Sequence, residues 1–114
     1  EYRDLRSTVL ASNRIGSDGT SPLLEWLDGQ QSKAQDKCIV RIERLAELGR
    51  ELRRPETDYL RDGIYELRAA LQGIQYRILY FFHGEQAIIS HGLIKHREVP
   101  PKEIDLAIKR KIRF

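Results

Sequence analysis

Two arginines at matching places in neighbouring strands are the residues of this sequence best suited to chemistry. Arg68 and Arg77 flank Gln72-Gly73, a pair that predicts a tight turn. Apolar and polar residues alternate on both sides of this turn, which places the two arginines, with Glu66, on the polar side of both strands. Cations that face each other across a strand pair repel. We therefore expect the pair either to hold an anion or to be neutralised by Glu66.

The two strands that carry these residues lie between Ile64 and Phe82 and share one apolar face. That face consists of Tyr65, Leu67, Ala69 and Leu71 in the first strand, and of Ile74, Tyr76, Ile78, Tyr80 and Phe82 in the second. Such a period of two is typical of a sheet with one buried side. We interpret Tyr76 and Tyr80 as core residues rather than as platforms for stacked bases.

Three segments that precede the two strands are predicted from weaker signals. Leu5 to Ala11 alternates weakly and is interpreted as an edge strand, and Asn13 to Thr20 is rich in Gly, Ser, Asn and Asp, which indicates a loop. Arg50 to Tyr59 is charged and contains Pro55, and we interpret it as a connector.

Two helices are predicted in the first half of the chain and form a helical hairpin. Their start and stop signals are Ser21 and Pro22 before a short helix that ends near Gly29, and the capping box of Ser32 and Gln35 before a helix from about Lys33 to Leu48, closed by Gly49. Cys38, the single cysteine, falls on the apolar stripe of the second helix, where we interpret it as a core thiol. It cannot form an internal disulfide, so we expect an intracellular, reducing compartment, the cytoplasm.

The second half predicts a third strand and a last helix. A turn at His83 to Glu85 is followed by a strand from Ala87 to Lys95, and Pro101 opens a helix. The buried stripe of that helix is predicted to be Ile104, Ala107, Ile108 and Ile112. Segregated helices and strands favour an α+β domain: a small antiparallel sheet of about four strands packed on the N-terminal helical hairpin and the C-terminal helix. We expect the other face of the sheet to be an open, shallow, basic concavity.

Length and composition indicate one small domain, residues 1–114. Hydrophobic residues make up 40% and charged residues 32%, and no apolar run approaches a membrane span or a signal peptide. The net charge of +3 is uneven, because residues 61–114 hold ten basic against six acidic residues, a balance of +4. This suits RNA or DNA as a partner, although lysines on a solvated helix face give the same count.

Further candidates for chemistry lie beyond the two strands. Histidine titrates near neutral pH, so His91 and His96 are candidate acid–base groups, with Glu66 as an alternative base. For His91, inside a strand, a packed or hydrogen-bonded role remains the alternative. Arg53 and Arg54 in the connector are possible RNA contacts, although acidic neighbours also suit a solvated loop. No zinc-ligand spacing or glycine-rich phosphate loop occurs, so we expect neither a metal nor a cofactor.

The stretch LRRPETDYLRDGIYELRAALQGIQYRILYFF, followed by IISHGLIKHREVPPKEIDLAIKR, resembles the RelE/HigB superfamily of toxins from bacterial toxin–antitoxin pairs, in particular the HigB-like, phage-related branch. The similarity covers roughly residues 20–112. It implies the microbial RNase fold and cleavage of mRNA in the ribosomal decoding site. It also implies a cognate antitoxin, expected to be a helix-turn-helix protein. The toxin would then bind operator DNA only through this antitoxin.

The resemblance also implies roles for single residues. Glu66 and Arg68 match positions at which RelE-like enzymes carry basic residues of the active face, and Arg77 matches the strand arginine that contacts the scissile phosphate. The basic group that ends the last strand is matched by Lys95, His96 and Arg97. In the implied reaction the ribose 2′-OH attacks the adjacent phosphorus without a metal, Arg68, Arg77 and Arg97 stabilise the added charge, and Lys95, Arg53, Arg54 and Lys102 bind RNA.

Other functions remain open. Ile104 stands where RelE carries a tyrosine, and Glu66 stands where it carries a lysine, which favours a binding protein of the same fold. Such a protein would be either a ParE-like gyrase inhibitor or an inactive toxin that survives as an antitoxin-binding co-repressor. A basic RNA-binding module without toxicity is a third hypothesis.

Overall fold

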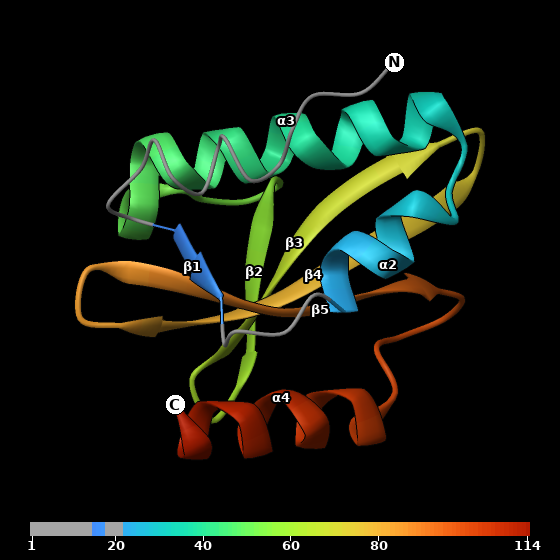
Figure 1. Cartoon of the computed structure of the whole chain (residues 1–114). Coiled ribbons are helices and arrows are strands. Elements are labelled where there is room, and N and C mark those ends of the chain that lie inside the picture. The colour runs from blue at the N-terminus through green and yellow to red at the C-terminus, as the bar shows by residue number, and fades with distance from the viewer. Residues whose placement is uncertain (1–14, 18–21) are drawn as a thin grey trace.

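The computed structural model describes residues 15–17 and 22–114, and Figure 1 shows the arrangement of their helices and strands. The elements in chain order are β1 (Ile15–Ser17), α2 (Pro22–Asp28), α3 (Ser32–Leu48), a short 3₁₀ turn (Gly49–Glu51), β2 (Thr57–Arg61), β3 (Ile64–Leu71), β4 (Ile74–His83), β5 (Gln86–Lys95) and α4 (Pro101–Arg113). The predicted α+β class is confirmed. The edge strand predicted at Leu5 to Ala11 lies outside the described residues.

The strands form one sheet in the order β1-β5-β4-β3-β2, in which β2 to β5 are antiparallel neighbours and β1 runs parallel to β5. Two hairpins have two-residue turns with positive φ at both positions: 53° and 83° at Asp62-Gly63, and 51° and 81° at Gln72-Gly73. These angles fit the type I′ turn, whose twist matches that of antiparallel strands. The predicted turn at Gln72-Gly73 is confirmed, and it sets the register of β3 on β4.

Helices cover both faces of this sheet (Figure 1). On the α3 face, α3 packs over β3 and α2 over β5, and the core consists of Leu23, Leu27, Ala34, Cys38, Ile39, Ile42, Leu45, Leu52, Leu67, Ala69, Tyr76, Ile78, Tyr80, Ala87 and Ile89. On the opposite α4 face, a smaller core consists of Ile64, Leu79, Phe81, Ile88, Val99, Ile104 and Ala107. The expectation of a face left open by the helices is therefore wrong where α4 packs on Ile64, Leu79, Phe81 and Ile88. A pattern of apolar residues in a helix does not say which side of a sheet the helix packs against.

Burial follows the predicted alternation in the central strands. Tyr76 and Tyr80 are buried, as predicted, and the Tyr80 hydroxyl lies 2.6 Å from Oγ1 of Thr57. Cys38 is fully buried, and burial raises the pKa of its thiol to about 12, which confirms a core role. Ile112 was expected in the buried stripe of α4, but its side chain is 78% exposed.

Three local expectations are wrong. Thr57–Arg61 is the strand β2, within and just beyond the segment interpreted as a connector, because the Asp62-Gly63 turn folds it back on β3. Ile15–Ser17, within the expected loop, pairs with β5. The capping box does not form: α3 begins one residue earlier, after Gln31, and Nε2 of Gln35 donates to the carbonyl of Leu27 at 3.0 Å.

None of the helices in residues 22–114 is long and apolar enough to cross a membrane.

Candidate functional site

Arg68 and Arg77 face each other directly across β3 and β4, as the alternation predicted. The N–H of Arg68 donates to the carbonyl of Glu56 at 2.8 Å, so it points away from β4. The two arginines are therefore a non-hydrogen-bonded pair, the closer of the two antiparallel arrangements, with Cα atoms typically about 4.5 Å apart. Two cationic side chains that face each other on such a pair need a counter-charge.

Glu66 supplies that counter-charge to both arginines. One carboxylate oxygen lies 2.9 Å from Nε of Arg68 and the other lies 3.3 Å from Nε of Arg77. The carboxylate is almost completely buried, with 3% of its side chain exposed. Of the two alternatives stated for this arginine pair, neutralisation by Glu66 is the one realised between these three side chains.

Asp58 in β2 extends the network to a third arginine. Its carboxylate accepts from Nη2 of Arg68 at 3.1 Å and from Nε and Nη2 of Arg54 at 2.9 Å each. The hydrogen bonds from Arg54 are the main cause that lowers the pKa of Asp58 below its ordinary value. We call Arg54, Asp58, Glu66, Arg68 and Arg77 the arginine cluster. Three guanidinium groups and two carboxylates give it a charge of +1.

Burial divides the cluster. The side chain of Arg77 is 7% exposed and that of Arg68 is 30% exposed. Loss of hydration lowers the pKa of Arg77 from its ordinary value, an effect that Glu66 opposes. Nη1 of Arg77 donates to the carbonyl of Tyr76 at 2.9 Å, and its Nε and the nearer oxygen of Glu66 make no well-directed hydrogen bond.

His91 lies on the same face of the sheet, one row from Arg77, but in a separate network with α4. Its Nδ1 lies 2.7 Å from the hydroxyl of Ser90 and its Nε2 lies 2.9 Å from a carboxylate oxygen of Glu103. This arrangement suits a neutral ring that accepts from Ser90 and donates to Glu103. Burial lowers the pKa of His91, and the Glu103 carboxylate opposes that shift. Arg110 donates to the carbonyl of Ser90 at 2.7 Å.

The remaining candidates lie at the end of β5, in the bend after it and at the start of α4. Lys95 is the register partner of Gln75, one row beyond Arg77, and the bend after β5 carries the exposed His96 and Arg97. Lys102 is exposed in the first turn of α4. Within residues 22–114, these four side chains make no hydrogen bond or ion pair. They are free to meet a ligand.

Arg53 is exposed in the segment before β2, next to Arg54. The structure thus brings Glu66, Arg68, Arg77 and Arg54 into one network and leaves Arg53 beside it. Sequence reasoning missed Asp58 as a member, because it was interpreted as part of a solvated connector. The Asp-Gly turn that follows it is the signal that could have placed it on a strand opposite Glu66.

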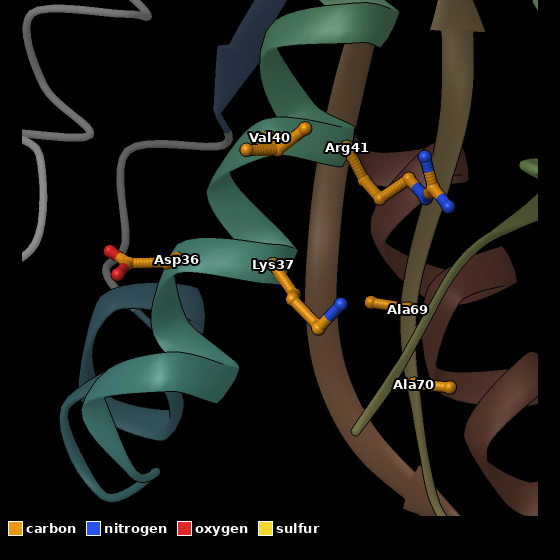
Figure 2. A pocket seen from close by; sticks show the side chains of 6 residues that line it. All are labelled: Asp36, Lys37, Val40, Arg41, Ala69 and Ala70. Carbon is orange, nitrogen blue, oxygen red and sulfur yellow. The ribbon is translucent and has the colours of Figure 1, made fainter. Parts of the chain in front are cut away.

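On the α3 face of the sheet, opposite the side chains of the cluster, a groove of about 230 Å³ lies between α3 and β3 (Figure 2). It is lined by Asp36, Lys37, Val40, Arg41, Ala69 and Ala70. The side chains of Lys37 and Arg41 point from α3 toward β3 in Figure 2, and Nε of Arg41 donates to the carbonyl of Arg68 at 2.8 Å. Because β2 pairs with β3 only as far as Leu67, Arg41 holds the strand where its neighbour ends.

Comparison with known proteins gives one match. The model of a family described as "Phage derived protein Gp49-like (DUF891)" matches residues 25–111, which include every member of the arginine cluster. No curated protein matches the chain. Across the described residues, no three His, Cys, Asp or Glu side chains gather in a group able to hold a metal ion.

Proposed function

We propose, from the premise that this chain belongs to the Gp49-like family of phage-derived proteins and so to the RelE/HigB-like toxin group, that it is a toxin which cleaves mRNA on the ribosome. The family is toxin-like, so a toxin–antitoxin role and an antitoxin partner are consistent with membership. Cleavage of translated mRNA, action in the cytoplasm, and a helix-turn-helix antitoxin that alone contacts operator DNA are the further parts of the proposal.

The observation that carries the proposal is the arginine cluster, with its net charge of +1 and with Lys95 one row beyond Arg77 on the neighbouring strand. A phosphodiester carries one negative charge, and its charge grows when a fifth oxygen attacks the phosphorus. Fixed guanidinium groups suit that state because they donate paired hydrogen bonds without rearranging. Of the facing pair, Arg68 is the partly exposed arginine. Arg97 is exposed in the bend after β5.

The proposed reaction balances without a metal. The 2′-oxygen forms a bond to phosphorus, the bond from phosphorus to the 5′-oxygen breaks, and the products are a 2′,3′-cyclic phosphate and a 5′-hydroxyl. One proton leaves the 2′-hydroxyl and one reaches the 5′-oxygen. His96 is the exposed group of suitable chemistry for one transfer. His91 has both ring nitrogens engaged, and Glu66 has both oxygens beside arginines, so each must release a partner to move a proton.

A second candidate is a binding protein of the same fold, either a gyrase inhibitor or an inactive antitoxin-binding co-repressor. Glu66 and Asp58 already neutralise two of the three arginines in the cluster, which is the observation that favours it. A cluster that is compensated by its own carboxylates can serve the stability of the sheet without binding an anion.

Induced expression in bacteria, with primer extension on a translated reporter mRNA, separates these functions. We expect the parent chain to arrest growth and to cut inside translated codons, and Arg68→Gln to do neither. Arg61→Gln is the matched control, because Arg61 is also an arginine held by two carboxylates, Asp62 and Asp105, but lies outside the cluster. It should behave as the parent does. Thermal unfolding of the purified variants checks that each is folded.

The other outcomes each select another function. Growth arrest without cuts, accompanied by altered supercoiling of plasmid DNA, would favour a gyrase inhibitor. Normal growth with the folded parent chain would favour the inactive binding protein and overturn the proposal.

A further inference from the structure

The two facing arginines differ in what their terminal nitrogens can reach. Nη2 of Arg68 binds Asp58, its Nε binds Glu66, and its Nη1 makes no hydrogen bond within residues 22–114. A guanidinium group has five N–H donors and these contacts use two of them, so Arg68 keeps three, two on Nη1 and one on Nη2, on a side chain that is 30% exposed. One N–H of Nη1 and one N–H of Nη2 lie side by side at the end of a guanidinium group, and this fork can donate two parallel hydrogen bonds to a phosphate.

Arg77 is placed differently. Its side chain is 7% exposed, Nη1 is used by the Tyr76 carbonyl, and Nη2 lies 3.4 Å from the side-chain oxygen of Gln75. Its Nε lies beside Glu66, whose side chain is 3% exposed. A ligand that binds in solvent cannot reach Nε of Arg77 without displacing Glu66.

The charges show what Arg77 does instead. Asp58 and Glu66 together carry −2, and without Arg77 they would cancel the charges of Arg54 and Arg68. The cluster would then be neutral and would attract an anion no longer. Arg77 offsets the charge of Glu66 from the buried side, so that the charge of Arg68 is left for a ligand on the solvent side.

We propose that Arg68 alone of the two contacts the phosphate group, and that Arg77 is a positioning residue that acts through Glu66. This differs from the role that the family resemblance implies for Arg77. The identity of the phosphate as that of RNA rests on the proposed function, whereas the division of roles rests on the burial and contacts of the two side chains. A conservative replacement separates the roles: lysine keeps the charge of arginine but loses its paired donors.

The test is a titration with inorganic phosphate, followed by NMR through the arginine Nε–H signals and backbone amides. In the parent chain we expect a saturable shift that is larger at Arg68 than at Arg77. Arg68→Lys and Arg68→Gln should each weaken phosphate binding at least tenfold. Arg77→Gln should also weaken it, but Arg77→Lys should restore binding to within about threefold of the parent, because a point charge beside Glu66 is sufficient. Arg61→Gln is again the matched control.

Several results would overturn the division of roles. These are equal losses in Arg68→Lys and Arg77→Lys, an unweakened Arg77→Gln, a larger shift at Arg77 than at Arg68, or no saturable shift in the parent. If the Arg77 variants fail to fold, the shifts in the parent decide. The result is independent of the expression assay: a chain that binds phosphate through Arg68 but cuts no mRNA contradicts the proposed function and leaves this inference standing.

Discussion

At the scale of single residues, burial has changed what the candidate groups can do. A histidine in a strand was a candidate acid–base group, yet both ring nitrogens of His91 are engaged, by Ser90 and Glu103. The facing charges of Arg68 and Arg77 correctly indicated a need for a counter-charge, and of the two sources named, a bound anion or Glu66, the structure shows Glu66. Exposure was not predictable: nothing in the alternation distinguishes Arg68 from Arg77, and their difference comes from their position relative to the sheet edge.

The burial of His91 leads to a prediction about pH. Burial is the main cause that lowers its pKa below 6.5, Glu103 opposes the shift and Arg110 adds to it. The unfolded chain therefore takes up a proton near pH 6.5 that the folded chain does not bind. Acidification below pH 6.5 should then lower the free energy of unfolding, until the pKa of the folded state is reached. We expect urea unfolding between pH 7.5 and 5.5 to show this loss, and His91→Gln to remove most of it.

The pH range from 7.5 to 5.5 separates the loss of stability due to His91 from the loss due to the carboxylates. Glu56 and Asp58 have pKa values lowered from 4.5 and 3.8, mainly by Arg44 and Arg54, so the stability they contribute is lost only at lower pH. His96→Gln, which removes an exposed histidine, is the control. If the parent and His91→Gln lose stability equally between pH 7.5 and 5.5, His91 is not the group responsible.

At the scale of elements, predictability depended on how local the signal is. The faces of β3 and β4 and their turn followed from alternation and Gln72-Gly73, because both signals are contained within one hairpin. Thr57–Arg61 was missed because its charged residues resemble a loop and its pairing with β3 depends on the Asp62-Gly63 turn. The packing of α4 on the far face of the sheet is a long-range contact, and no pattern within the helix specifies it.

The groove between α3 and β3 gives a prediction for one such long-range contact. Arg41 donates to the carbonyl of Arg68 and lies 3.6 Å from the carboxylate of Glu56, where β2 no longer covers β3. Arg41→Ala should lower the free energy of unfolding by about 1–2 kcal/mol, the typical cost of a hydrogen bond whose acceptor is left partly buried. Urea unfolding measures this loss.

Arg44 supplies the control for that measurement, because it lies on the same helix and contacts the same Glu56 carboxylate without touching the strand. Arg44→Ala should cost less than Arg41→Ala. A larger loss in Arg44→Ala would mean that the ion pairs of Glu56, rather than the strand carbonyl, are what α3 contributes at this edge.

At the scale of the whole molecule, one sheet separates two cores of unequal size. Among the described residues, the core of the α3 face has fifteen buried side chains and that of the α4 face has seven. Helix α4 contributes only Ile104 and Ala107 to its core as buried residues, whereas α3 contributes five of its side chains to the other. Partly buried Ile108, the ring contact of Phe114 with Phe81, and polar contacts such as that of Glu103 with His91 make up the other attachments of α4. Regions with few buried contacts open before the whole domain unfolds.

We therefore expect α4 to detach while α3 and the sheet stay folded, and amide hydrogen exchange can show it. Ile42 lies in the core of the α3 face, and the contacts of Ile42 persist when α4 detaches. Ile42→Ala should therefore speed exchange in β4 and leave exchange in α4 unchanged. The contacts of Ile104 are lost both when α4 detaches and when the whole molecule unfolds. Ile104→Ala should therefore speed exchange in both α4 and β4, by the factor that corresponds to a loss of about 2–4 kcal/mol in the free energy of opening. Equal acceleration of α4 by both variants would mean that α4 opens only with the whole molecule. Local opening would expose Leu79 and Phe81 beside the arginine cluster and release His91 from Glu103, so the same measurement tests whether the acid–base candidate can become free in the folded sheet.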